Sequence, residues 1–162
     1  MSEHPTEPGT EPVLPSSGMN EDAYPAPPQL HWALVLLFTL LTLGLFIIVW
    51  IFVQSTWARK INPASNATAW FACYVPFAIV GQLMMEGTGG VRAVGLLLML
   101  VSYGAFYLGT YSIRRSMLNH YNKVEPMQLE LSAAMTFLFS SFYLQYHMTR
   151  IGRWKAASKL AV

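Results

Sequence analysis

Charged residues and cysteines are both scarce in this sequence. Only 11% of the 162 residues are charged, whereas 54% are hydrophobic, an unusual balance for a soluble domain of this size. Cys73 is the single cysteine, which excludes an intramolecular disulfide and a metal site built from several cysteines. The composition therefore indicates a membrane protein with room for one domain.

Motifs for catalysis are missing as well. The sequence contains no metalloprotease HExxH, no phosphate-binding GxxxxGK[ST] and no GxSxG nucleophile elbow. No two of its histidines are three or four residues apart, the spacing at which two side chains of one helix can bind the same metal ion. They stand at positions 4, 31, 120 and 147. We therefore expect no enzymatic activity, no cofactor and no metal site, although His147 could titrate near neutral pH.

The first 29 residues differ from the rest of the chain. They contain seven of the ten prolines and five acidic residues, and no lysine or arginine. Such a segment cannot bury enough apolar surface to offset its ordering entropy. We expect residues 1–29 to form a disordered acidic tail ahead of a helical membrane domain at 30–155 and a short basic tail at 156–162.

Three uncharged apolar runs have the length of membrane-spanning helices. The first, residues 30–54, would be roughly 37 Å long as a helix. The second, residues 69–85, contains Pro76 and Gly81 and should be kinked. The glycines of EGTGG, residues 86–90, then predict a tight turn before the third run at 94–113. We expect three transmembrane helices over these ranges.

The third run has two different helical faces. At 100° per residue its small residues fall on one narrow seam, while its tyrosines line up on the other side. A seam of small residues lets two helix backbones approach closely in lipid. We therefore assign to helix packing Gly95, Ser102, Ala105, Gly109 and Ser112.

A fourth segment, about 127–149, is apolar but carries a polar stripe. Six polar side chains recur at steps of three and four residues, and on an α-helix they fall within an arc of about 80°. A second, weaker seam contains Ser141, Gln145 and Thr149. The stripe itself consists of Ser132, Thr136, Ser140, Tyr143, His147 and Arg150.

Lysine and arginine positions bear on the orientation of these segments. If three runs cross with the N-terminus outside, only Arg92 lies in the external turn. Keeping the fourth segment at the cytoplasmic face gives nine cations inside against one outside, whereas a fourth crossing gives five on each side. Charge thus favours an interfacial or re-entrant amphipathic helix. Length also permits a fourth span, because the 18 residues of Leu131–Met148 can just cross the hydrocarbon core.

The basic end of the chain is predicted to anchor the protein at the lipid headgroups. Arg153, Trp154 and Lys155 combine cations with an indole, a combination suited to anionic lipid headgroups. We expect the lipid bilayer to be the partner of this end, and we expect no nucleic acid to bind.

Two stretches carry a resemblance to a known family. One is T-L-G-L-F-I-I-V-W at 42–50, in a run that ends with Trp57, Arg59 and Lys60; the other is LSAAMTFLFSSFYLQYHMTRIGRWK at 131–155, with its Y-x-Q-Y-H-x-x-R-I element. Together they resemble a family of small bacterial multi-pass membrane proteins classed only as a domain of unknown function, in which a tyrosine often stands where Phe46 is here. The resemblance covers about residues 30–155 and implies no activity.

The sequence thus predicts an all-α integral membrane protein of the bacterial cytoplasmic (inner) membrane. Our first hypothesis is a non-enzymatic helical module that associates with itself or with a membrane partner through the small-residue seam. The alternative is a small transport or channel subunit with a path lined by Gln82, Tyr107, Tyr143 and His147. A third hypothesis, an enzyme acting on lipid, has no nucleophile to support it.

Overall fold

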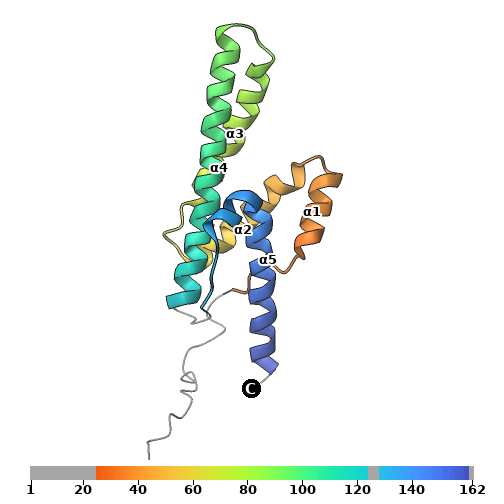
Figure 1. Cartoon of the computed structure of the whole chain (residues 1–162), viewed down its shortest axis with the longest axis vertical. Coiled ribbons are helices and arrows are strands. Elements are labelled where there is room, and N and C mark those ends of the chain that lie inside the picture. The colour runs from red at the N-terminus through yellow and green to blue at the C-terminus, as the bar shows by residue number, and fades with distance from the viewer. Residues whose placement is uncertain (1–24, 124–127, 161–162) are drawn as a thin grey trace, which may run out of the picture.

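The protein is helical throughout the part that the structure describes. The computed structural model describes residues 25–123 and 128–160, and within them it contains five helices and no strand. The all-α prediction is therefore confirmed. The helices, shown in Figure 1, are α1 (Trp32–Leu41), α2 (Leu45–Ile61), α3 (Ala67–Met85), α4 (Gly90–Lys123) and α5 (Ala133–Leu160).

Two helices are long and apolar enough, by length and composition, to cross a membrane. They are α3 and α4, which form an antiparallel hairpin that projects beyond the other helices (Figure 1). Only 11% and 17% of their most apolar stretches are buried, so most of their apolar side chains lie outside the hydrophobic core. Leu83 and Leu100, for example, are 68% and 62% exposed. The hairpin therefore presents an apolar outer surface.

The first predicted span, residues 30–54, is not one helix, and that prediction is wrong. The chain turns at Leu43 and Gly44, whose φ values of 52° and 94° are left-handed, a conformation that glycine adopts without steric cost. The backbone N–H of Gly44 donates to the carbonyl of Thr39 at 2.7 Å, and that of Phe46 to the hydroxyl of Thr42 at 2.9 Å. The run therefore ends one helix and begins another.

The start of α3, the end of α4 and the end of the N-terminal tail differ from the predicted ranges. Helix α3 begins two residues before the predicted range and continues through Pro76. Helix α4 continues to Lys123 instead of ending at Ile113, because Met117 and Tyr121 are buried on one face of the added turns. Residues 1–24 lie outside the described part. Residues 25–29, predicted as part of a disordered tail, contact the helices instead.

Helix α5 contains a break that the sequence pattern does not reveal. Ser140 has φ 42° and ψ −119°, far from helical values, and the helix changes direction there. Ser132 precedes the helix. The six residues of the predicted polar stripe therefore do not share one straight helical face, and that prediction is wrong. The helix also continues to Leu160, through most of the predicted basic tail at 156–162.

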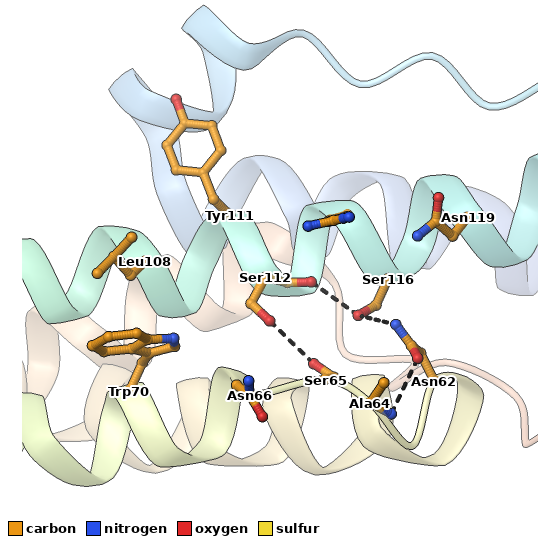
Figure 2. A pocket seen from close by; sticks show the side chains of 11 residues that line it. Asn62, Ala64, Ser65, Asn66, Trp70, Leu108, Tyr111, Ser112, Ser116 and Asn119 are labelled. Carbon is orange, nitrogen blue, oxygen red and sulfur yellow. Dashed lines mark hydrogen bonds between the residues drawn. The ribbon is translucent and has the colours of Figure 1, made fainter.

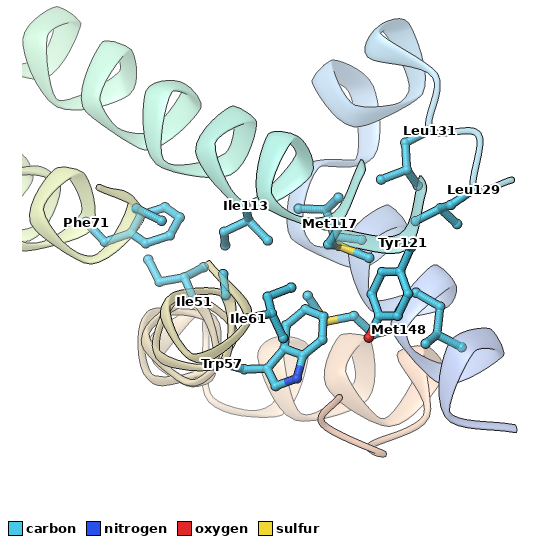
Figure 3. Close-up of a cluster of buried hydrophobic side chains, with 14 residues drawn as sticks. Ile51, Trp57, Ile61, Phe71, Ile113, Met117, Tyr121, Leu129, Leu131 and Met148 are labelled. Atoms are coloured by element: carbon cyan, nitrogen blue, oxygen red, sulfur yellow. The ribbon is translucent and has the colours of Figure 1, made fainter. Parts of the chain in front are cut away.

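A hydrophobic core joins α2, the end of α4 and α5 beside the base of the hairpin. Figure 3 shows Trp57 of α2 facing Tyr121 of α4 and Met148 of α5. The rings of Trp57 and Tyr121 are stacked with centroids 6.5 Å apart. Burial of large side chains such as these contributes about 1.5–3 kcal/mol each. The core therefore fixes α5 against α2 and against the end of α4.

Candidate functional site

The small-residue seam of α4 lies against α3 of the same chain. A Cβ atom added to Gly95 would stand 2.9 Å from the backbone of Met84 and Met85, and one added to Gly109 would stand 2.7 Å from the ring of Phe71. The hydroxyl of Ser112 lies 3.3 Å from that of Ser65. The seam is therefore covered within the chain, and it offers no free surface to the partner that the sequence suggested.

The weaker polar seam of α5 supplies the main buried polar network. The amide of Gln54 on α2 donates to Oε1 of Gln145 at 3.1 Å and accepts from the hydroxyl of Ser141 at 2.5 Å. Gln145 in turn donates to the carbonyls of Pro28 and Leu30, at 3.0 and 2.6 Å.

This network joins three separate segments: α2, α5 and the chain before α1. Gln54 and Gln145 are 1% and 0% exposed, and their amide nitrogens each have two acceptors. A satisfied buried network of this kind fixes a unique arrangement and leaves no donor for a ligand. The i, i+4 spacing of Ser141, Gln145 and Thr149 was the available signal in the sequence, and Gln54 had none.

Residues of the predicted stripe have local structural roles. The Tyr143 hydroxyl accepts from the backbone N–H of Ser132 at 3.1 Å, and the hydroxyl of Thr136 donates to the carbonyl of Ser132 at 2.8 Å. Arg150 is exposed. These contacts hold the segment before α5 and its first turn.

His147 is the stripe residue with unusual surroundings. It is 7% exposed and lies between the rings of Tyr143 and Tyr146, with centroids at 4.7 and 5.3 Å. Its Nδ1 atom is buried without a hydrogen-bond partner in the described part of the chain. Burial, and secondarily the charge of Arg150, lower the pKa of His147 from its ordinary value of 6.5. These surroundings therefore favour the neutral imidazole.

The predicted headgroup anchor divides into two environments. Arg153 and Trp154 are exposed on α5. Lys155 is half-buried, and its ammonium lies 5.7 Å from the ring centroid of Tyr121, a cation–π contact. Lys155 therefore also contributes to holding α5 against α4.

The four residues suggested for a transport path lie on different parts of the molecule. Gln82 is exposed near the turn of the hairpin, where the neighbouring Gly81 meets Met99. Tyr107 is eight residues further along α4 than Met99, roughly 12 Å at the helical rise, and it stacks on Phe137. Tyr143 and His147 belong to α5. Gln82 is thus separated from the other three.

A pocket of about 570 Å³ opens at the base of the hairpin, between the α2–α3 loop and α4 (Figure 2). Hydrogen bonds join several of the residues that line it. Asn62 Nδ2 donates to the Ser116 hydroxyl at 3.2 Å, and Ser116 donates to the carbonyl of Ser112 at 2.9 Å. The lining residues are Asn62, Ala64, Ser65, Asn66, Trp70, Leu108, Tyr111, Ser112, Arg115, Ser116 and Asn119.

Four side chains that line this pocket have hydrogen-bond donors without a partner in the described part of the chain. Asn66, Trp70, Arg115 and Asn119 make no side-chain hydrogen bond to any residue in the described ranges. No carboxylate lines the pocket. The sequence did not predict this pocket: Asn119 lies one helical turn from Arg115 on α4, but Asn66 comes near them only through the fold.

Known proteins give no further guidance to the site. No family model, curated protein or solved structure matches the chain. Among the residues that the structure describes, no three His, Cys, Asp or Glu side chains gather closely enough to hold a metal ion. Within residues 25–123 and 128–160, the fold defines an all-helical protein with two helices of membrane-spanning length.

Proposed function

We propose that the protein is a non-enzymatic module of the bacterial inner membrane, held in the bilayer by the α3–α4 hairpin. The observation that carries this proposal is the separation of apolar surface from charge. Exposed leucines and valines cover the hairpin, whereas nine of the ten lysines and arginines precede α3 or follow Ile113. Such a bias favours the cytoplasmic side for the cationic end.

The first apolar run supports an arrangement with two crossings instead of three. Trp57, near the end of α2, donates its indole N–H to the carbonyl of Pro25 at 3.1 Å. The chain therefore enters and leaves the α1–α2 region on one side. Figure 1 shows the turn between these helices pointing the same way as the hairpin but reaching less far.

The tip of this region is suited to hydrocarbon. Leu41 and Leu43 are 75% and 95% exposed. Helix α1 has 10 residues and is about 15 Å long, half the thickness of a bilayer core. We infer that α1 and α2 form a re-entrant hairpin that enters one leaflet. The N-terminus is then cytoplasmic, whereas three crossings would put it outside.

Reporter fusions to the full chain test this topology. A fluorescent protein that matures only in the cytoplasm should fluoresce when fused before Met1, and a phosphatase active only outside should be active when inserted in the turn at Gly87–Gly89. A cytoplasmic N-terminus with an external turn at residues 87–89 requires two crossings, whereas an external N-terminus with the same external turn requires three, so the pair of fusions distinguishes the two topologies. An inactive N-terminal fluorescent fusion would restore three crossings and refute the re-entrant hairpin.

Membrane residence is tested separately by alkaline carbonate extraction. The chain should remain with the membrane pellet, because the hairpin is held by hydrocarbon and not by charge. Release into the supernatant would refute the membrane module itself.

A further inference from the structure

We propose that the pocket at the base of the α3–α4 hairpin binds the phosphate region of an anionic phospholipid, with Arg115 as the cation that holds it. This inference rests on the proposed membrane function. It concerns a site separate from the basic end of α5, which the sequence had suggested as the headgroup contact.

The pocket lies where the surface of the hairpin changes from apolar to polar. Trp70 is in the first turn of α3, and Leu108 is among the last exposed apolar residues of α4 before its arginines. Figure 2 shows these two side chains together at one end of the pocket, and Asn62, Ser116 and Asn119 toward the other. A phospholipid has the same order of chemistry, from acyl chain through glycerol to phosphate.

Neighbouring arginines at this level have different tasks. Arg114 is half-buried, and its guanidinium donates twice to the carbonyl of Leu131, with Nε at 3.1 Å and Nη2 at 2.5 Å. It therefore holds the chain before α5. Arg115 is exposed, lines the pocket and makes no such bond among the described residues. Its planar set of donors matches the oxygens of a phosphodiester.

Further donors surround the same space. The amides of Asn66 and Asn119 and the indole N–H of Trp70 line it without a hydrogen-bond partner in the described part of the chain. Asn66 is also the N-cap of α3 and makes no side-chain cap bond to its first turn. Uncapped backbone N–H groups at a helix start add to the attraction for an anion.

Two observations favour a lipid over a soluble phosphate, and an anionic lipid over a zwitterionic one. The side chain of Leu108 is 50% exposed and adjoins the apolar outer surface of α4, against which acyl chains would lie. The pocket lining contains no carboxylate that could pair with the amine of a choline or ethanolamine headgroup. The site is therefore complementary to the phosphate, and not to the positively charged amine of a zwitterionic headgroup.

The test uses the full chain, reconstituted in mixed bilayers of phosphatidylglycerol and phosphatidylcholine and released into mild detergent. Native mass spectrometry then counts the retained lipids. The wild type should retain phosphatidylglycerol preferentially. Arg115→Gln should lower that preference by roughly tenfold, the value of one hydrogen bond to a charged group. Asn66→Ala should lower it as well, without any change of charge.

Arg59→Gln is the matched control. Arg59 is an exposed arginine at the end of α2, outside the pocket lining, and its loss removes the same charge. It should leave the lipid preference almost unchanged. Equal losses in Arg59→Gln and Arg115→Gln would show diffuse attraction to the bilayer and overturn the site, as would an unchanged preference in Arg115→Gln with normal helix content.

A competition experiment separates the two sources of phosphate. Soluble glycerol phosphate should not displace the retained phosphatidylglycerol, because it lacks the acyl chains. Displacement at concentrations comparable with those of a short-chain phosphatidylglycerol would overturn the lipid assignment. Carbonate extraction of the same proteins distinguishes the two hypotheses. A wild type that stays in the membrane but shows no lipid preference refutes the pocket, whereas release of the wild type from the membrane refutes the membrane module.

Discussion

Alanine at Gly95 tests how closely α3 and α4 approach each other. The added Cβ would lie 2.9 Å from the carbonyl carbon of Met84, 2.9 Å from the nitrogen of Met85 and 3.0 Å from the carbonyl oxygen of Gly81. Carbon atoms in favourable contact are about 3.5–4.0 Å apart. All three neighbours are backbone atoms, so no side-chain rotation relieves the overlap. The two helices must separate locally.

Gly104 offers a matched control on the same helix. A Cβ there meets nothing within 4 Å. Both substitutions gain the same helix propensity, up to about 1 kcal/mol in a helix interior. Overpacking a well-packed contact costs about 1–3 kcal/mol. The free energy of unfolding of Gly95→Ala should therefore be lower than that of Gly104→Ala by about 1–3 kcal/mol.

Unfolding can be followed by circular dichroism of the full chain in mixed micelles, titrated with a denaturing detergent. Gly104→Ala should unfold at the same detergent fraction as the wild type or a higher one, and Gly95→Ala at a lower one. Equal midpoints for the two variants would refute the close contact between α3 and α4. A change of oligomer size without loss of stability would instead show that Gly95 faces a second chain.

Two further predictions concern single titratable side chains. Because the pKa of His147 is lowered in the folded protein, the unfolded chain binds more protons just below pH 6.5, and stability that is present above that pH is lost as the pH falls. His147→Gln should therefore flatten this part of the curve of melting temperature against pH. A wild-type curve that is already flat there would contradict the burial of the imidazole. Cys73 is exposed on α3, about 9 Å beyond its start, so a water-soluble maleimide should fail to label it in intact membranes and should label it after denaturation; fast labelling in intact membranes would show that α3 lies in water.

The hairpin could be predicted from sequence because its signals are continuous. Two uncharged runs on either side of EGTGG have the length of a span, and α3 begins within two residues of the predicted range. The end of α4 was missed because residues 114–123 are amphipathic, and hydropathy alone does not recognise a helix that buries one face. Long-range packing of Met117 and Tyr121 extends the helix there.

The turn at Gly44 and the break at Ser140 could not be predicted in the same way. Hydropathy reports which residues avoid water, but not the backbone torsion that they adopt. Gly44 stands in a run of leucines that a straight helix would accommodate equally well. The pocket was missed for another reason: Asn66 and Arg115 are 49 positions apart, and nothing in either local sequence indicates that they share a surface.

The left-handed turn at Leu43 and Gly44 bears on whether the chain crosses the membrane an even or an odd number of times. In the proposed re-entrant arrangement, the turn brings the first apolar run back to its own side, so the number of crossings would be even and the two ends of the protein would share one compartment. A straight helix over the same residues would make the number odd and separate the acidic N-terminal segment from the basic end. In the re-entrant arrangement, the left-handed backbone conformation of two residues, Leu43 and Gly44, would determine which compartment receives the acidic residues at the start of the chain.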